Sequence, residues 1–478
     1  MFGTNNDSNG RSIDNNNNGN VSKIYPEARY FVSKAQHNVR YDFSSKTQPV
    51  LKVDQDDLVH VETNDCFHGM VQPDSLLSWE EKMKKNSSNN DDFGGASSNS
   101  NGSSTSTSSC SILDEIPRSK RNPVTGPIYV NGARPGDILA VTLLDIRPKG
   151  IGVSCCGSQS GQLCHLMKKD SISIRFFDLD QCRTIVTMRD DDDDDHNNDN
   201  KEEEEEEEDM TNNSNESVEN ITTTDNTNSP NLQHPQQPPK RWRQRRLGPI
   251  SFPASPMLGV IGVAPSSEDE DPIDTIPAGK HGGNLDNNCN GIGSTIYLPI
   301  NHPGALLSIG DMHASQGDGE IAGTGVEIGG DVLLKCRVIK QEDVYGKLLF
   351  DDDEEDETIE TSSSLSSSSS SCNNSSKWKL EYPVTETATH WITHGVVEGD
   401  IPKTTSIACT EAAKILVTQW GFTIEESFIF LSVKGDLGLC QACNPDVGTQ
   451  IAKMSVPKIE NVCPRPFRVL MPQRSPSS

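Results

Sequence analysis

Residues 281–327 read HGGNLDNNCNGIGSTIYLPINHPGALLSIGDMHASQGDGEIAGTGVE and form the most informative part of the chain. Carboxylate, imidazole and amide side chains lie there on short glycine-rich segments, on either side of an apolar run at 294–300. Glycine permits the tight turns that bring such groups together, and carboxylates and imidazoles are ligands of divalent cations. The stretch therefore predicts an active site and not a core. Its candidate polar residues are Asn284, Asp286, Asp311, His313, Gln316, Asp318, Glu320 and Glu327.

Short apolar runs outside this stretch predict a mainly β structure. Several of them alternate apolar and polar side chains, as half-buried strands do. Clusters of Pro, Gly, Asn and Asp separate the runs at short intervals, which is typical of antiparallel sandwiches and barrels. The predicted strands are residues 50–63 (alternating from Leu58), 138–146, 172–177 and 332–338.

Helical patterns are scarce before the C-terminal part of the chain. Residues 407–420 place six apolar side chains on one stripe, and Gly421 follows as a stop signal. Thr423 and Glu426 have capping-box spacing and predict a second short helix through Phe430. We expect both helices to pack on a sheet.

Low-complexity segments divide the chain. Asn-, Ser-, Asp- and Glu-rich segments offer too little apolar surface to offset the entropy of ordering them. We expect a disordered tail at 1–22, disordered inserts at 86–108, 190–246 and 351–377, and a tail at 471–478. Residues 23–189 and 247–470 then form the N-terminal and C-terminal parts of one fold.

The net charge of −28 overstates the acidity of the folded part. Acidic runs at 190–195, 202–209 and 351–357 contribute 21 negative charges, and all lie in the predicted inserts. The basic run at 240–246 (KRWRQRR) is interpreted as a solvated linker beside the acidic insert. We therefore expect no nucleic-acid partner.

The 13 cysteines are irregularly spaced, and the first residues lack the apolar segment of a secretory signal. This pattern favours free thiols in a reducing compartment, so we expect a cytoplasmic protein. No window contains 18 consecutive apolar residues, and no membrane partner is expected. The pairs Cys155–Cys156 and Cys440–Cys443 lack a second pair at zinc-ribbon spacing and are interpreted as ordinary thiols.

Other chemistries find little support in the motifs. No dinucleotide fingerprint, phosphate-binding loop or Gly-x-Ser-x-Gly elbow is present. The segment SCCGSQSG at 154–161 has no recognisable base nearby and is predicted to be a flexible loop. Metal-assisted hydrolysis remains the chemistry most compatible with the stretch at 281–327.

Several co-ordered segments resemble the acetamidase/formamidase family. They are ETNDCFHGMV at 62–71, TGPIYVNGARPGDILAV at 125–141, GVIGVAPS at 259–266, GGNLD at 282–286, PGALLSIGDMHASQGDGE at 303–320, GTGVE at 323–327 and CNPDVGTQIAKMSVPK at 443–458. The resemblance is closest to a formamidase with low-complexity insertions. It implies a jelly-roll-like β-sandwich with added α/β elements, a divalent metal, a homo-oligomer, and hydrolysis of short aliphatic amides to a carboxylate and ammonia.

On this reading the site residues divide into two groups. The predicted ligands of a divalent metal, zinc before others, are Asp65, Asp286, His313 and Glu320. Glu327 is the predicted general base, with Asp311 as the next candidate for that role or as a further ligand. Asn284 and Gln316 are predicted to orient the amide or its oxyanion. Asp318, between two glycines, is equally natural as a turn residue.

Two alternatives stay open. One is a metal hydrolase that acts on another amide or on a cyclic imide, because the loops that set pocket size cannot be placed from sequence. The other is a non-catalytic sandwich that binds a cation or a carbohydrate. Calcium takes oxygen ligands, so an imidazole from His313 inside the cluster favours zinc and hydrolysis.

Overall fold

The computed structural model describes residues 22–88, 111–159, 161–189, 249–269, 271–344, 379–443 and 448–459. Nearly all of these belong to one compact unit made of residues 1–188 and 251–478, whereas a second unit comprises 189–250. The predicted inserts and tails lie outside the described residues, with two exceptions. Residue 22 is described, and residues 86–88 end a helix, α1 (Pro73–Ser88).

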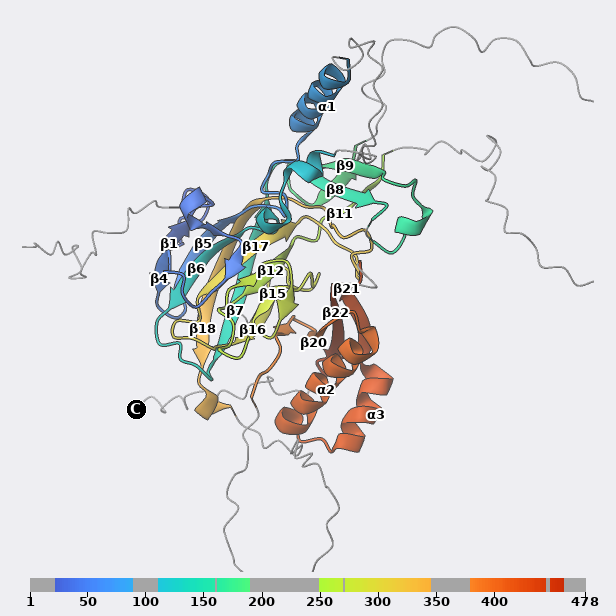
Figure 1. Ribbon diagram of the computed structural model, residues 1–478. Helices are drawn as coiled ribbons and strands as arrows, with labels where there is room; N and C mark the ends of the chain where they lie inside the picture. Colours follow the sequence, from blue (N-terminus) through green and yellow to red (C-terminus); the bar gives the residue numbers. More distant parts are fainter. Residues whose placement is uncertain are drawn as a thin grey trace, which may run out of the picture. The chain divides into compact units, whose positions relative to one another are not determined.

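A nine-stranded sheet forms the larger layer (Figure 1). Its strands, in spatial order, are β1 (Tyr30–Val32), β5 (Leu58–Thr63), β18 (Gly330–Ile339), β7 (Ile138–Pro148), β16 (Thr295–Pro299), β19 (Val384–Glu386), β20 (His390–Glu398), β22 (Thr449–Pro457) and β21 (Asp436–Gln441). All neighbours are antiparallel except β1 and β5. Strands from both halves of the sequence alternate in this sheet, so the two halves build one core.

A seven-stranded sheet forms the second layer. Its path is β14 (Ala278–Gly279), β15 (Gly282–Asn284), β12 (Met257–Gly262), β17 (Leu307–His313), β6 (Val124–Val130) and β2 (Val39–Arg40), and β4 (Leu51–Val53) pairs with β6. Fully buried side chains from the two sheets share one hydrophobic cluster, for example Val61 and Leu139 from the first and Ile128, Leu258 and Ile309 from the second. Burial of this apolar surface is what holds the layers together.

Two smaller sheets complete the β structure. One contains β8 (Gly152–Gly157), β9 (Ile172–Leu179), β10 (Ile185–Met188) and β11 (Ser251–Pro253). The other pairs β3 (Asp42–Phe43) with β13 (Ile273–Asp274). The predicted flexible loop at 154–161 was therefore wrong in its first half, which pairs with β9 from end to end.

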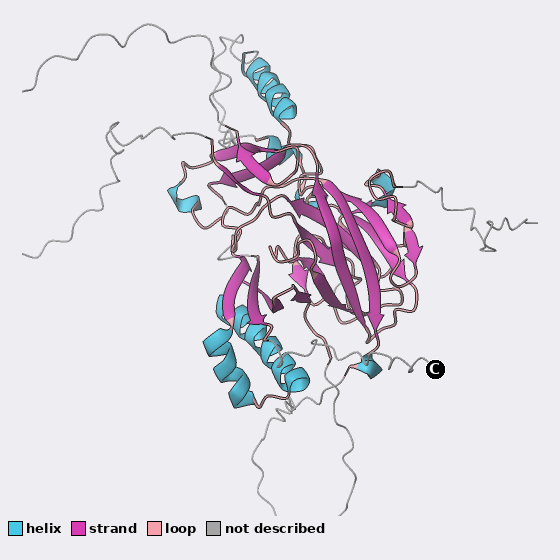
Figure 2. Ribbon diagram, turned by 180° about the vertical axis from the view of Figure 1, so that it is seen from behind, coloured by secondary structure: helices cyan, strands magenta, loops and turns pink. Residues whose placement is uncertain are grey.

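The C-terminal helices lie against the β20–β22 end of the large sheet (Figure 2). Helix α2 (Ile401–Trp420) buries Ala408, Ala412 and Leu416 in a cluster with Trp391 of β20 and Met454 of β22. It begins six residues before the predicted start, at an N-cap formed by Asp400, and ends as predicted at Gly421. Helix α3 (Ile424–Lys434) has the predicted capping box.

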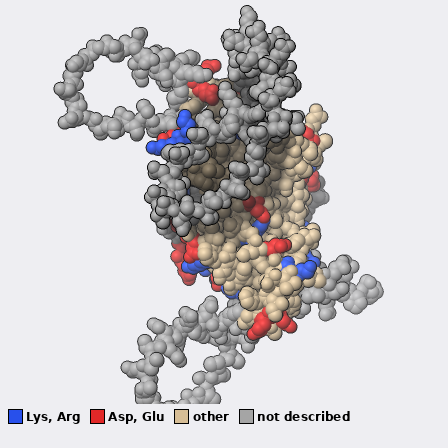
Figure 3. Space-filling model, turned by 90° about the vertical axis from the view of Figure 1, so that its right-hand side faces the viewer, with Lys and Arg blue, Asp and Glu red and all other residues tan. Residues whose placement is uncertain are grey.

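Helix α1 was not predicted, but it is the one α-helix that the described ranges contain before the C-terminal part, so the expectation that helix is scarce there is confirmed. The mainly β fold class with C-terminal helices is confirmed. None of the helices in the described ranges has both the length and the apolar character needed to cross a bilayer. On the face drawn in Figure 3, acidic and basic side chains of the described residues are interspersed among neutral ones.

Candidate active site

The acidic cluster forms where the end of β17 meets two loops. Asp311 and His313, two residues apart on this strand, are both buried. Asp286 lies just beyond β15, and its backbone N–H donates to the carbonyl of Gly259 on β12. The segment after β17 returns to the strand, so that Glu327 forms a β-bridge with His313. Residues far apart in sequence thus meet at one end of the smaller layer.

The ligand atoms of these residues converge. Nε2 of His313 lies 3.0 Å from Oε2 of Glu327 and 3.5 Å from Oδ1 of Asp311. Asp286, His313 and Glu320 each offer one ligand atom, and these three atoms lie within 4.8 Å of one another. Cys66, Asp311 and Glu327 form a second such group. His313 lies close to members of both groups, so the two groups form one continuous site.

Several atoms of the cluster are buried and make no well-aligned hydrogen bond, although Nε2 of His313 and Oε2 of Glu327 lie within ion-pair distance of each other. They are Oδ1 of Asn284, Oδ1 of Asp286, Oδ1 of Asp311, Nε2 of His313 and Oε2 of Glu327. Leaving a buried polar or charged atom unpaired costs about 1–3 kcal/mol or more. The three carboxylate oxygens and the imidazole nitrogen in this set have lone pairs that fit a divalent cation, which would pair with these four atoms at once.

Three of the acids have left-handed backbone conformations. The φ angles are 43° for Asp286, 52° for Asp311 and 41° for Glu320. Such conformations cost about 1–3 kcal/mol each for residues other than glycine and gather at functional sites. The convergence of these carboxylates on one point is therefore accompanied by local backbone strain.

Glutamine side chains hold the ligand groups in place. Oε1 of Gln316 lies 2.7 Å from Nδ1 of His313, and its Nε2 donates to the backbone carbonyl of Asp286 at 2.6 Å. Nε2 of Gln441, at the end of β21, donates to Oδ2 of Asp286 at 2.6 Å and approaches Oε2 of Glu320 at 3.3 Å. With Nδ1 of His313 donating to Gln316, the lone pair of Nε2 is directed at the cluster.

Burial shifts the pKa values of the cluster. Burial raises the pKa of Asp286 to about 7, with a further rise from the Asp311 carboxylate. Burial also raises the pKa of Glu327 to about 8, and that of Glu320 well above its ordinary value. Burial opposes the charged imidazole of His313, but Glu327 and Asp311 raise its pKa well above the usual value. In the absence of a cation, the groups therefore hold protons among themselves.

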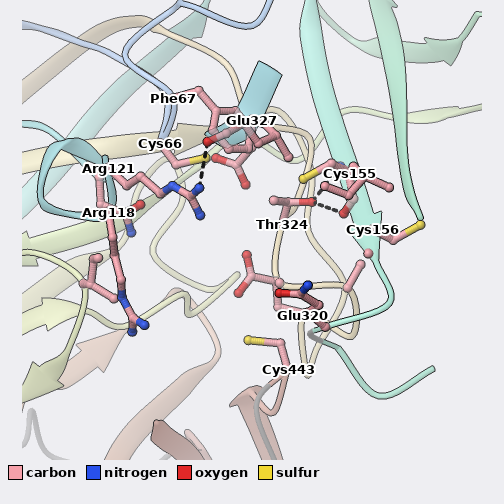
Figure 4. A pocket seen from close by; sticks show the side chains of 18 of the residues that line it. Cys66, Phe67, Arg118, Arg121, Cys155, Cys156, Glu320, Thr324, Glu327 and Cys443 are labelled. Atoms are coloured by element: carbon pink, nitrogen blue, oxygen red, sulfur yellow. Dashed lines mark hydrogen bonds between the residues drawn. The ribbon is translucent and has the colours of Figure 1, made fainter. Parts of the chain in front are cut away.

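The cluster opens into a cavity of about 650 Å³ (Figure 4). Asn284, Asp286, Asp311, Glu320 and Glu327 line it, together with residues from β8, from the 441–443 segment and from the 118–122 segment. In Figure 4, Glu327 and Glu320 lie at the cavity. Thr324 lies between these two side chains and the strand that carries Cys155. A small polar substrate can reach the buried acids from this side.

The structure brings together most of the predicted site residues. Asn284, Asp286, Asp311, His313, Gln316, Glu320 and Glu327 all belong to the cluster or contact it. Asp65 belongs to neither ligand group, and its Oδ1 accepts the backbone N–H groups of Phe67 and Gly69 at 2.9 and 2.7 Å. Asp318 forms an ion pair with Lys453 at 2.5 Å.

Sequence reasoning missed three contributors, Cys66, Asn122 and Gln441. Nδ2 of Asn122 donates to Oδ2 of Asp311 at 3.3 Å. These residues come from segments far from 281–327, and no local motif marks them. For Cys66, the one available signal was that it directly follows the predicted ligand Asp65 in the sequence.

This fold and site define a two-layer β protein with a buried carboxylate–histidine centre. The family model of the Acetamidase/Formamidase family matches residues 102–273 and 269–436, which together exceed half of the chain. The chain belongs to the Acetamidase/Formamidase family.

Individual proteins give the same picture. An acetamidase of Mycolicibacterium smegmatis is 28% identical over 239 residues, 45% of this chain and 53% of that protein. A formamidase of Methylophilus methylotrophus is 35% identical over 100 residues, 20% of this chain and 25% of that protein. The chain thus spans about half or less of the length of these curated relatives.

The crystal structure of an acetamidase from Bacillus halodurans matches this fold with a TM-score of 0.55 at 24% identity. The match covers 89% of this chain and 97% of that chain. At this level of identity, the likeness shows the shared fold.

Proposed function

We propose that the protein hydrolyses short aliphatic amides, formamide to formate and ammonia or acetamide to acetate and ammonia, with a divalent cation bound at the acidic cluster. The observation that carries the proposal is the convergence of unpartnered, buried ligand atoms in a chain of this family. The names of the relatives support the substrate class.

The residues that would hold the cation are Asp286, His313 and Glu320, with Asp311 beside them. An imidazole among carboxylates suits zinc better than calcium or magnesium. A cation bound there would supply Lewis acidity toward water and the amide carbonyl. Gln316 and Gln441 fix the orientation of the ligands through the hydrogen bonds that they make to them.

Glu327 is proposed as the general base. Its carboxylate would accept a proton from the attacking water and deliver it to the nitrogen as the C–N bond breaks. A pKa raised to about 8 by burial, and lowered again by a nearby cation, places this carboxyl where it can both accept and donate near neutral pH. The N–H of Gly325 donates to Oε1 at 2.8 Å, which leaves Oε2 for the reaction.

Asn284 is proposed to recognise the amide. Its Oδ1 is buried, lacks a partner and belongs to a residue that lines the cavity. An amide N–H₂ group is the donor that would satisfy it. Gln316 is committed at both ends to His313 and Asp286, so we assign it to positioning and not to the substrate.

The remaining expectations are also proposals. Cysteines of the described ranges such as Cys66, Cys336 and Cys440 are free thiols, which supports a reducing compartment such as the cytoplasm. A homo-oligomer is proposed on the family resemblance, and sedimentation of the full-length protein tests it.

The test of function is ammonia release by the purified full-length protein from formamide, acetamide, propionamide and urea, before and after chelation. We expect release from formamide or acetamide, loss on chelation and recovery on adding Zn²⁺. No release from any short amide by metal-loaded protein would refute the proposed activity. Release that survives complete removal of metal would refute the role of the cation.

A further inference from the structure

Two arginines lie on one wall of the cavity, beside the acidic cluster. Arg118 is the first residue of a short 3₁₀ turn, η3 (Arg118–Lys120), and Arg121 is its C-cap, whose backbone N–H donates to the carbonyl of Arg118 at 3.1 Å. Both Arg118 and Arg121 line the cavity. Figure 4 shows them on the side opposite Thr324, Cys155 and Cys156.

The next residue along the chain fixes this wall to the cluster. The backbone N–H of Asn122 donates to the carbonyl of Cys66 at 3.0 Å, and its side chain donates to Asp311 at 3.3 Å. Arg121 is therefore the immediate neighbour in sequence of a residue, Asn122, that contacts the acidic cluster directly. The side chain of Arg121 is itself fixed at one point, by the hydrogen bond from its Nη2 to the carbonyl of Leu113.

The charges of the two guanidinium groups are not balanced locally. Nη2 of Arg121 donates to the carbonyl of Leu113 at 3.0 Å, whereas its Nε is buried without a partner. Asp114 lines the same cavity, but its Oδ2 accepts the backbone N–H of Ser111. Within the described ranges, neither arginine forms an ion pair with a carboxylate. A half-buried guanidinium with donors to spare is suited to an anion.

The cavity has room for more than the smallest amide. Its volume of about 650 Å³ falls within the range of about 300–1,000 Å³ typical of sites for much larger ligands. Formamide has only three non-hydrogen atoms. The part of the cavity that a small amide leaves empty is therefore lined by two guanidinium groups without an ion-pair partner in the described ranges.

We propose that Arg118 and Arg121 form a carboxylate-binding subsite next to the acidic cluster. Guanidinium groups bind carboxylates through paired, charge-assisted hydrogen bonds. The carboxylate has two possible sources, the acid produced by hydrolysis or a carboxylate carried on the acyl chain of the substrate amide. The assignment of these sources rests on the proposed function, whereas anion binding itself does not.

The binding test uses metal-loaded, full-length protein with Glu327→Gln in every protein compared, so that the amide is not turned over, and two probes of the same shape, acetate and acetamide. We expect Arg121→Gln to weaken acetate binding about tenfold in calorimetry and to leave acetamide binding unchanged. Arg121→Lys should lose less, because it keeps the charge. Arg118→Gln, at an exposed position, provides a second variant that leaves the Leu113 contact intact.

Lys120→Gln is the matched control. Lys120 lies on the same turn, but its ammonium stacks over Tyr41 at 4.3 Å and does not line the cavity. Acetate affinity should not change in this variant. Equal acetate affinity in wild type, Arg118→Gln and Arg121→Gln would overturn the proposal, as would equal losses for acetate and acetamide.

A kinetic comparison separates the two sources. If the substrate carries the carboxylate, Arg121→Gln lowers kcat/KM for succinamate about tenfold and leaves that for butyramide unchanged. If the product is the ligand, Arg121→Gln weakens inhibition by acetate and leaves kcat/KM unchanged for both succinamate and butyramide. A protein that released no ammonia would refute the proposed function, but its acetate affinity would still decide the subsite.

Discussion

Gly259 lies against the acidic cluster, where the absence of a side chain leaves room for two carboxylates. A Cβ at this position would lie 2.6 Å from Oδ1 of Asp286 and 2.9 Å from Oδ2 of Asp311. Gly259→Ala should therefore displace at least one carboxylate. Overpacking of this kind costs about 1–3 kcal/mol, so we expect Zn²⁺ affinity to fall by about five- to 150-fold in calorimetry.

Gly317→Ala is the control for this variant. A Cβ there meets nothing within 4 Å, and the residue lies in the same glycine-rich stretch. Its Zn²⁺ affinity should equal that of wild type. Equal affinities in wild type and Gly259→Ala would mean that the cation does not depend on the Asp286–Asp311 arrangement.

His394 makes folding stability depend on pH. Its Nδ1 lies 2.8 Å from the carbonyl of Pro383, and its Nε2 lies 3.0 Å from Nδ2 of Asn287. The ring must therefore be neutral, with its proton on Nδ1. Burial lowers the pKa of His394 to about 4, and Lys453 adds to the effect.

Because this folded-state pKa lies below the ordinary value of about 6.5, the unfolded chain binds a proton first as the pH falls. The contribution of His394 is complete above about pH 6.5 and declines toward pH 4, by up to about 3 kcal/mol. Urea unfolding at pH 7, 6, 5 and 4 should show a shallower loss of stability in His394→Gln than in wild type. Identical slopes would show that His394 is not the responsible group.

Sequence predicted the acids of the 281–327 stretch because a local pattern, carboxylates among glycines, carries that signal. It could not separate ligands from turn formers, because both use Asp. Asp65 illustrates this, because its carboxylate accepts two backbone N–H groups as a turn residue does, while its role as a ligand stays a prediction. Cys66 and Gln441 reach the site only through pairing of distant strands, which no local spacing encodes.

At the scale of elements, the end of α2 offers a clear test. Gly421 has φ 73° and ψ 24°, and a Cβ there would meet nothing within 4 Å. A substitution at Gly421 would therefore be unfavourable because of its left-handed backbone conformation and not because of a steric clash. Gly421→Ala should destabilise the fold by about 1 kcal/mol in urea unfolding, and Gly421→Asn by less. Equal stability of all three proteins would contradict the left-handed cap.

The β10–β11 hairpin predicts what happens when residues 190–248 are removed. Thr187 and Ser251 are partners in antiparallel register, so the chain leaves and re-enters the sheet at adjacent positions. A two-residue Asn-Gly turn can close such a hairpin. We expect the shortened protein to keep the unfolding midpoint and any amidase activity of the full chain. Loss of soluble protein would show that the excised residues contribute to the fold.

Element boundaries were least predictable where polar residues begin a helix. Residues 402–406 of α2 read PKTTS and are not apolar in a helical pattern, so the start was placed too late, whereas the Asp400 cap marks it in the structure. Strands whose sequences alternate apolar and polar side chains, such as β5 and β18, were identified from that pattern, although both are buried along most of their length. Helix α1 has a weakly apolar sequence and gave no clear periodicity.

For the molecule as a whole, the fold class followed from composition and from strand-length apolar runs. The order of strands did not, because β18 lies between β5 and β7 although it begins at residue 330, whereas they end at residues 63 and 148. This interleaving brings the ends of distant loops to one place. The account of function depends on that convergence and on the cation that it is proposed to hold.

The most direct measurement compares metal content and ammonia release in wild type, His313→Ala and Glu327→Gln. Elemental analysis and turnover of formamide are determined on the same full-length preparations. We predict that His313→Ala loses both metal and rate, and that Glu327→Gln keeps its metal but turns over at least about a hundredfold more slowly, since a general base contributes about that much. Full metal in His313→Ala, or normal turnover in Glu327→Gln, would contradict the account.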